Sequence, residues 1–337
     1  MEARGETVEF TAADDSDRRC RGGELATAPP RRQMLYIVGL GLGGERGITV
    51  RGLDAVRRCA RVYMEARTAL LTLGVGGDPS SRLTKLENLC GNEVTVAGRE
   101  IVEEESGDQI LREATGADIA FLVVGHPFGS DEPSSKATHT DLVVRAKNMG
   151  IEVKVIDSAS VLNAVVACGL ELHRYGEALT IPFFTETCRR DHFNQAIVNN
   201  RWLGLHTLCL LHSPCFSLFD FFSSVDIYAK EPIPESLIRG LRRGNKVYEP
   251  PRFMTANTAI SQLLEVLEMR GEPEPAYDEH SLCIGVARLG SDDEKIVAGP
   301  MRKLVDVDFG PPPHCLVIVG ETTKVEEEML EFYMIRS

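Results

Sequence analysis

Short apolar runs of strand length alternate with segments of helical periodicity as far as residue 211. The runs predict strands at 35–38, 61–65, 94–96, 119–124, 153–156, 179–184 and 207–211. Apolar residues at helical spacing predict helices that begin at the cap Thr49 and that lie at 108–114, 138–149 and 160–170. The run at 119–124 is apolar throughout, which is typical of a central parallel strand covered on both faces. This alternation predicts an α/β layer with mostly parallel strands.

The alternation stops at 212–245, a stretch with several prolines and a phenylalanine-rich run. After it the pattern predicts a helix at 255–269, strands at 281–289 and 315–319, and a final helix at 325–333. The first residues of the chain are polar and lack the apolar stretch of a secretory signal. The predicted organisation is a disordered extension at 1–33, an N-terminal α/β domain at 34–212, a linker with an insertion at 213–246 and a C-terminal α/β domain at 247–337.

Charge and cysteine usage narrow the choice of partners and compartment. The chain has 37 Lys and Arg residues against 50 Asp and Glu residues, and this net charge of −13 disfavours binding to a phosphate backbone. Its 9 cysteines are odd in number and contain no C-x-x-C pair, a pattern typical of a reducing compartment. No apolar run approaches the roughly 18 residues of a membrane span. We expect a cytoplasmic protein without a nucleic-acid or membrane partner.

A glycine-rich turn follows the first predicted strand. Gly39, Gly41 and Gly44 match the G-x-G-x-x-G spacing, in which the backbone approaches a pyrophosphate at a helix N-terminus. Glu65 ends the second predicted strand, where a Rossmann fold carries its ribose-binding acid. The next helix is predicted to begin only at Thr49, which is late for that fold. The motif therefore leaves open both an NAD-binding domain and an ordinary glycine-rich turn.

The loop at 125–129 follows the buried strand at 119–124. Carboxyl ends of central strands line the ligand crevice of open α/β sheets, so this loop is a candidate binding site. His126, His139 and His314 are each candidate bases or metal ligands, but no two histidines have the spacing of a metal site. The chain has no G-x-S-x-G motif and no P-loop lysine. From these patterns we identify no catalytic residue and no metal site.

Several collinear segments carry a more specific signal. They are MLYIVGLGLG at 34–43, 48–65, 120–129, ATHTDL at 137–142, ASVLNA at 159–164, HTLCLL at 206–211, YEPPRFM at 248–254, ARLG at 287–290 and 313–314. In these segments the chain resembles the diphthine synthases, which are tetrapyrrole-methylase-like (class III) methyltransferases. The likeness runs from Met34 to the C-terminus in the right order, so it is far more specific than one glycine motif.

The resemblance implies a two-domain tetrapyrrole-methylase-like α/β fold, in which each domain is a mixed or mostly parallel sheet flanked by helices. It implies S-adenosyl-L-methionine as the methyl donor, bound in the cleft between the domains. It also implies a homodimer that methylates the 3-amino-3-carboxypropyl-histidine of elongation factor 2 in diphthamide biosynthesis. The positions that match the family's donor contacts are Leu42, His126, Gly129, Ser160, Val161, Leu211, Leu289 and His314.

The chain departs from that family in its loops. His126 stands where the family has an aspartate, and residues 130–136 are inserted in the same loop. The segment 215–222 also lies outside the family pattern. Because imidazole is neutral or positive near neutral pH, His126 changes the charge presented to the donor. Three other functions stay open, namely a tetrapyrrole precursor methylase, an NAD-binding Rossmann oxidoreductase and a non-enzymatic binding module.

Overall fold

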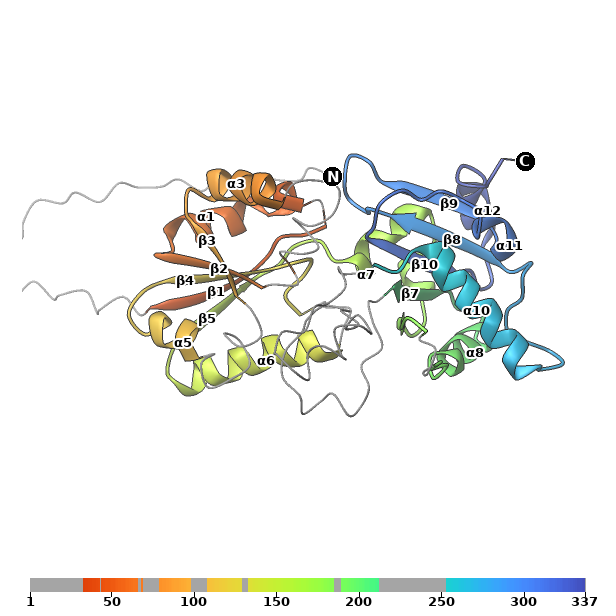
Figure 1. Ribbon diagram of the computed structural model, residues 1–337, viewed down its shortest axis with the longest axis horizontal. Coiled ribbons are helices and arrows are strands. Elements are labelled where there is room, and N and C mark those ends of the chain that lie inside the picture. The colour runs from red at the N-terminus through yellow and green to blue at the C-terminus, as the bar shows by residue number, and fades with distance from the viewer. Residues whose placement is uncertain are drawn as a thin grey trace, which may run out of the picture. The chain divides into compact units, whose positions relative to one another are not determined.

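Two five-stranded sheets organise the described part of the chain (Figure 1). The computed structural model describes residues 33–42, 44–65, 68, 79–97, 108–128, 133–184, 189–211 and 253–336, all within the unit Gln33–Ser337. The predicted N-terminal extension, apart from Gln33, and the predicted linker at 213–246 lie outside the described residues. None of the helices described is long and apolar enough to cross a membrane.

The first sheet is parallel throughout, with the strand order β3-β2-β4-β1-β5. Its strands are β1 (Met34–Gly39), β2 (Arg61–Glu65), β3 (Val94–Ala97), β4 (Ile119–Val123) and β5 (Glu152–Ile156). The central position of β4 accounts for its apolar sequence, because every residue of this strand is buried. All five strands confirm the prediction to within one residue at each end.

Helices cover both faces of this sheet (Figure 1). Two pack on one face and two on the other: α1 (Val50–Arg58) and α3 (Pro79–Cys90), then α5 (Asp108–Ala114) and α6 (Pro133–Asn148). The predicted cap is confirmed, because Oγ1 of Thr49 accepts a hydrogen bond of 3.1 Å from the N–H of Gly52. The first half of the chain thus forms the expected helix-covered parallel layer.

The second sheet is mixed, with the strand order β6-β7-β10-β8-β9. Its strands are β6 (Leu179–Ile181), β7 (Thr207–Leu211), β8 (Leu282–Ala287), β9 (Lys295–Pro300) and β10 (His314–Ile318). β6 and β7 are parallel, and the other neighbours are antiparallel. The predicted fold class, with parallel or mixed sheets flanked by helices, is confirmed.

Helices flank the second sheet too. Those that pack on one face are α8 (Asn194–Trp202), α10 (Ala256–Arg270) and α11 (Met301–Leu304). Those on the other face are α7 (Val161–Ala164), a 3-10 turn (Val165–Cys168) and α12 (Lys324–Leu330). Two more 3-10 turns lie at Gly44–Gly47 and Leu172–Arg174. α10 begins at its cap Thr255 and ends at Gly271, which has a φ of 57°.

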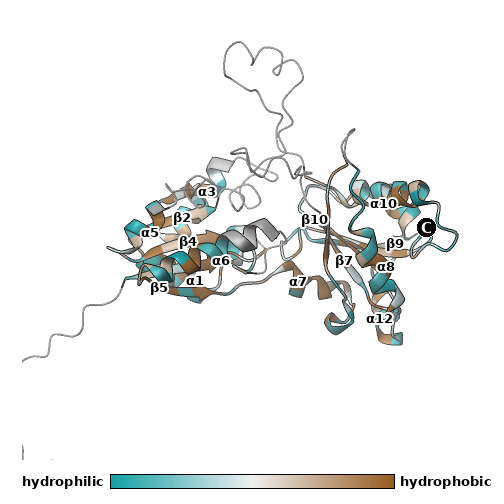
Figure 2. Cartoon of the chain, turned by 90° about the horizontal axis from the view of Figure 1, so that it is seen from below, coloured by the Kyte–Doolittle hydropathy of each residue, from teal (hydrophilic) through white to brown (hydrophobic). Residues whose placement is uncertain are grey.

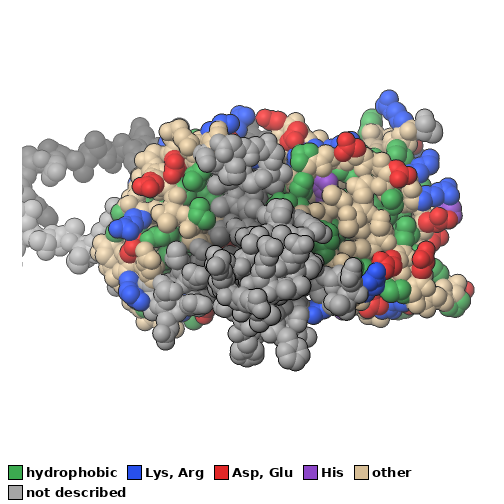
Figure 3. All heavy atoms as spheres, viewed as in Figure 1, with side chains coloured by type: hydrophobic (Ala, Val, Ile, Leu, Met, Phe, Trp, Pro, Cys, Tyr) green, Lys and Arg blue, Asp and Glu red, His purple; other side chains and the backbone are tan. Residues whose placement is uncertain are grey.

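Hydropathy and charge follow this architecture. In Figure 2 the strands of both sheets are mostly apolar, while α10 alternates polar and apolar positions as an amphipathic helix does. On the face seen in Figure 3, acidic and basic side chains of the described residues are interspersed. The net charge of −13 is therefore not gathered into one patch on that face.

The structure corrects the predicted place of two strands. We expected 179–184 and 207–211 to belong with the first sheet, but both are in the second sheet, where Leu210 of β7 pairs with Cys315 of β10. The chain changes sheet between β5 and β6. Strand pairing joins segments far apart in sequence, so a local pattern does not reveal it. The predicted domain limits themselves stay a prediction.

Other elements differ from the pattern for local reasons. The predicted helix at 160–170 is only α7 and a 3-10 turn, which ends at Gly169 with a φ of 93°. α3, α8 and β9 were not predicted. In α8 the buried residues are Asn194, Ile197 and Asn200, so its inward face is largely polar and shows little apolar periodicity.

Candidate functional site

Three loops meet at the carboxyl edge of the first sheet, after β1, β4 and β5. Gly41 and Gly125 exchange backbone hydrogen bonds of 3.3 and 3.0 Å. The hydroxyl of Ser158 donates to the carbonyl of Gly47 at 3.1 Å. A Cβ added to Gly39 would lie 2.4 Å from the carbonyl oxygen of Gly125. Only glycine at position 39 lets these backbones approach so closely.

The glycine motif does not form a dinucleotide-binding turn. Gly44 opens a 3-10 turn, and α1 begins only at Val50. A Cβ added to Gly44 would meet nothing within 4 Å, whereas one added to Gly52 would lie 2.9 Å from Val38. Close packing of helix on strand, which is the role of the third glycine in a Rossmann turn, therefore belongs to Gly52.

Glu65, the expected ribose-binding acid of a Rossmann fold, belongs to a polar network within the protein. One carboxylate oxygen accepts a hydrogen bond of 3.0 Å from the hydroxyl of Thr68, and the other lies 3.3 Å from Nε2 of His139. Nδ1 of the buried His139 lies 2.8 Å from the carbonyl of Pro127. The N–H of Val124 donates to Thr68 Oγ1 at 2.7 Å. Glu65 and His139 thus hold the loop after β4.

His126 engages both of its ring nitrogens within the protein. The N–H of Phe128 donates to Nδ1 at 3.0 Å. The ring proton is therefore assigned to Nε2, which lies 3.3 Å from Oδ1 of Asp157. The side chain of His126 is 31% exposed and that of Asp157 is 76% exposed. The pair joins the loop after β4 to the segment after β5.

Two segments lead from this edge to the second sheet. Ser160 is 5% exposed and caps α7, because its hydroxyl accepts a hydrogen bond of 3.2 Å from the N–H of Leu162. Leu42 and Val161 pack against the apolar cluster on one face of the second sheet, and Leu289 belongs to the same cluster. Three predicted donor contacts from distant parts of the chain therefore share one apolar cluster.

Leu211 and His314 lie at neighbouring strand ends of the second sheet, since β7 ends at Leu211 and β10 begins at His314. Nδ1 of His314 accepts a hydrogen bond of 3.3 Å from the N–H of Ala256, and Nε2 lies 3.1 Å from the carbonyl of Pro311. This arrangement assigns the neutral Nε2–H tautomer. Burial lowers the pKa of His314 from its ordinary value of 6.5.

Arg288 holds the segment that leads to His314. Its guanidinium donates to the carbonyls of Phe309 at 2.8 Å, Pro311 at 2.5 Å and Asp293 at 2.8 and 3.1 Å. Its backbone φ of 50° lies in the left-handed region, where a residue with a Cβ is strained. The hydrogen bonds of the guanidinium oppose this strain and stabilise the strand end.

Replacing Arg288 by lysine is expected to lower the free energy of unfolding by about 1–3 kcal/mol. One ammonium group cannot replace the planar fork of N–H donors that binds several carbonyls. Urea unfolding of Arg288→Lys beside the unmodified chain measures the loss. Arg302→Lys, at an exposed position of α11, is the control and should change stability by less than about 0.5 kcal/mol. Equal stability of the two variants would contradict this role for Arg288.

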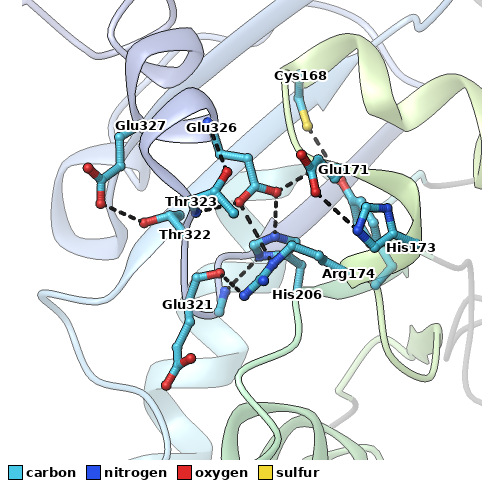
Figure 4. A network of polar contacts seen from close by, with 12 residues as sticks. Cys168, Glu171, His173, Arg174, His206, Glu321, Thr322, Thr323, Glu326 and Glu327 are labelled. Carbon is cyan, nitrogen blue, oxygen red and sulfur yellow. Dashed lines mark hydrogen bonds and ion pairs between the residues drawn. The ribbon is translucent and has the colours of Figure 1, made fainter.

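A buried network on the second sheet centres on Glu326 (Figure 4). Its carboxylate accepts hydrogen bonds from the N–H groups of Glu171 at 2.9 Å and Thr323 at 2.7 Å. Nε2 of the buried His206 lies 3.1 Å from the same carboxylate, and Nδ1 accepts from the N–H of Gly320 at 3.0 Å. His206 is therefore the neutral Nε2–H tautomer, and burial lowers its pKa. The network ties α12 to the residue before β7.

Burial by itself raises the pKa of Glu326. The N–H groups of Glu171 and Thr323, together with the ring of His206, outweigh burial and lower this pKa from 4.5 to about 2. The folded protein thus binds fewer protons at this carboxylate than the unfolded chain does between these two values. Stability from Glu326 is therefore fully present above 4.5 and is lost as the pH falls through about 2.

This shift predicts how acid acts on the fold. The unmodified chain should lose about 3 kcal/mol of stability from Glu326 as the pH falls from about 5 to 2, and Glu326→Gln should lack this loss. The difference in unfolding free energy between the two, measured with urea at several pH values, should narrow on acidification. Glu327→Gln, at an exposed neighbour, is the control. A difference that stays constant down to about pH 2 would contradict the shift.

The structure therefore places all the predicted donor contacts except Gly129, which lies outside the described residues. Their role as donor contacts stays a prediction. The sequence patterns did not indicate Asp157 or Arg288 as residues of the site. Asp157 had a usable signal in the sequence, because it directly follows a strand at the ligand-binding edge of the sheet. Nothing in the sequence marks the left-handed backbone of Arg288.

Among the described residues, no cluster of three or more His, Cys, Asp or Glu side chains is placed to hold a metal ion.

A parallel sheet followed in the chain by a mixed sheet is the architecture of a known group of enzymes. The sequence model of the tetrapyrrole (corrin/porphyrin) methylases matches residues 34–305. The chain belongs to this family. It is accordingly a methyltransferase, and the expected family resemblance is confirmed.

Within this family, the chain is similar over most of its length to proteins of one kind. The chain is 55% identical to a probable diphthine methyl ester synthase of Arabidopsis thaliana, over 90% of this chain and 99% of the relative. It is 46% identical to the diphthine methyl ester synthase of Homo sapiens, over 90% of this chain and 95% of the relative. A crystal structure of a diphthine synthase superposes with a TM-score of 0.65 and 25% identity, over 89% of this chain and 96% of that one.

These comparisons and the site geometry disfavour the other enzyme readings. An NAD-binding oxidoreductase has no support, because Gly44 does not begin α1 and Glu65 is engaged by His139 and Thr68. A tetrapyrrole precursor methylase has the same fold, but both of the relatives named above are diphthine methyl ester synthases.

Proposed function

We propose that the chain acts as a diphthine methyl ester synthase, which transfers methyl groups from S-adenosyl-L-methionine to the 3-amino-3-carboxypropyl-histidine of elongation factor 2 in diphthamide biosynthesis. The observation that carries the proposal is the identity of 55% and 46% to relatives of that name over 90% of the chain. The donor contacts of the proposal are Leu42, His126, Gly129, Ser160, Val161, Leu211, Leu289 and His314.

The described residues of this set fit such a donor. Leu42, Val161 and Leu289 share an apolar cluster, which suits a flat adenine ring. His314 is neutral, so it places no positive charge beside a sulfonium. The guanidinium of Arg288 is directed at backbone carbonyls. Apolar surface suits the adenine ring of this donor, and these neutral or internally engaged groups add no positive charge beside its sulfonium.

When bound, the donor supplies a methyl group that its sulfonium has already activated. The protein therefore has to align the nucleophile and exclude water, and it needs no dedicated acid–base pair. The glycine contacts between the loops after β1 and β4 keep the edge of the first sheet closely packed for this purpose. The amine of the substrate must be unprotonated to provide its electron pair.

The test is a transfer assay with purified components. The full chain is mixed with methyl-labelled S-adenosyl-L-methionine and with elongation factor 2 that bears the aminocarboxypropyl histidine. We expect label on the factor, and part of it should be released as methanol when mild base hydrolyses the methyl ester. The same factor with an unmodified histidine is the control. No label on the modified factor, or equal label on the control, would overturn the proposal.

The proposal includes a homodimer located in the cytoplasm. The cysteine pattern supports this location. Light scattering after gel filtration measures the mass of the particle, and a monomer would remove the dimer from the proposal. Imaging of the tagged full chain tests the location, and a signal confined to an organelle would contradict it.

A further inference from the structure

We propose that Asp157 is the anionic group of the methyl-donor site and that His126 is the residue that positions it. This inference rests on the proposed function, because it assigns a contact to the donor named there. It concerns the loop after β4 and the segment after β5, which meet at the carboxyl edge of the first sheet.

Both ring nitrogens of His126 are engaged within the protein, so its contact with the donor is not a hydrogen bond from the ring. The N–H of Phe128 donates to Nδ1 at 3.0 Å, so this nitrogen carries no proton. Nε2 carries the proton and lies 3.3 Å from Oδ1 of Asp157. The imidazole therefore acts as a brace between two segments and fixes where the carboxylate lies.

Asp157 is accessible, whereas Glu65 is largely buried. Both follow or end strands of the first sheet, and both are acidic. Glu65 is 15% exposed and lies against Thr68 and His139. The side chain of Asp157 is 76% exposed, although Oδ1 lies 3.3 Å from Nε2 of His126. Of these two carboxylates, Asp157 is the one that a ligand can reach.

Asp157 also lies within the segment that carries other residues of the predicted donor site. Its neighbour Ser158 donates to the carbonyl of Gly47, which fixes this segment against the glycine loop that carries Leu42. Ser160 follows two residues later and caps α7. Because ligands bind at the carboxyl ends of strands in open α/β sheets, this position favours contact with a bound nucleoside.

The chemistry of the donor fits an anion here. S-adenosyl-L-methionine carries a sulfonium and an ammonium group, and both attract a carboxylate. His314 is neutral and contributes no compensating charge on the second sheet. Asp157, oriented by His126, therefore provides the charge that distinguishes a cationic nucleoside from a neutral one.

The first test measures donor affinity by calorimetry on the full chain. Asp157→Asn should lower the affinity for S-adenosyl-L-methionine by about 10–100-fold. Asp191→Asn is the matched control, because Asp191 is also a partly exposed carboxylate, paired with Arg270 at 2.7 Å, and it should bind as the unmodified chain does. S-adenosylhomocysteine is the second ligand, because it lacks the sulfonium charge and keeps the ammonium group. A larger loss for the methionine form assigns the contact to the sulfonium, and equal losses assign it to the ammonium group.

The second test exchanges the two residues. His126→Asp removes the ring that holds Asp157 and places a repelling carboxylate beside it, so this variant should bind the donor more weakly. Asp157→His removes the anion and should also bind the donor more weakly. The double variant restores one acid and one imidazole, so its affinity should return to within about threefold of the unmodified chain. Thermal unfolding of each variant separates loss of binding from loss of folding. A double variant that folds but binds no better than the weaker single variant would overturn the pairing.

The outcomes also separate this inference from the proposed function. If the unmodified chain binds S-adenosyl-L-methionine and Asp157→Asn binds it equally well, the inference is overturned and the function stands. If the unmodified chain binds no S-adenosyl-L-methionine, the proposed function and the inference are both overturned.

Discussion

Glu326→Ala is expected to lower the free energy of unfolding by about 3–5 kcal/mol. The carboxylate is fully buried and accepts hydrogen bonds from the N–H groups of Glu171 and Thr323. It is also the partner of His206, whose ring is buried with it. Alanine leaves these donors without an acceptor in a place that water does not reach, and each buried unsatisfied group is costly. It also removes the capping box that starts α12.

The measurement is urea unfolding of Glu326→Ala beside the unmodified chain near neutral pH. Glu327→Ala is the matched control, since Glu327 is the next residue of the same helix and is exposed. The control should change stability by less than about 0.5 kcal/mol. A loss for Glu326→Ala as small as that of the control would show that the network does not stabilise the fold.

Gly39→Ala is expected to lower kcat/KM for methyl transfer by about 100-fold. The new methyl group would lie 2.4 Å from the carbonyl of Gly125, 3.0 Å from Ser158 and 3.1 Å from Pro127. All three residues belong to the loops after β4 and β5, so the backbone of these loops has to move. Those loops carry His126 and the segment before Ser160, and small displacements of positioning groups are costly to the rate.

The assay should be joined by donor affinity and thermal unfolding, which distinguish a displaced site from an unfolded chain. Overpacking of this kind costs about 1–3 kcal/mol, so a folded but weakened variant is expected. Gly116→Ala is the matched control, because an added Cβ there would be 3.8 Å from its nearest neighbour. Gly39→Ala with unchanged donor affinity and rate would show that the loop contact does not position the site.

Most of the first sheet was predictable because its signals are local. The unbroken apolar sequence of β4 followed from burial on both faces, and the cap at Thr49 followed from a side chain that bonds three residues ahead. α8 was not predictable in this way. Its inward face includes Asn194 and Asn200, whose partners Tyr277 and Glu177 lie elsewhere in the sequence.

The candidate site was predictable only as a set of residue types. A resemblance in sequence indicated Leu42, Val161 and Leu289, and the structure unites them in one apolar cluster. The sequence suggested two separate roles, Glu65 as a ribose-binding acid and His139 as a catalytic base or metal ligand. In the structure these two side chains are partners of each other. Asp157 gained significance only when His126 was found beside it.

The sequence by itself determined the family, the parallel layer and the residues available for chemistry, because apolar periodicity, caps and collinear motifs are properties of neighbouring residues. The tertiary structure alone decided that β6 and β7 join β10, that Glu65 is engaged by His139, and that His126 braces Asp157. Each of these depends on contacts between residues far apart in the chain. Such contacts form only when the burial of apolar surface brings the segments together.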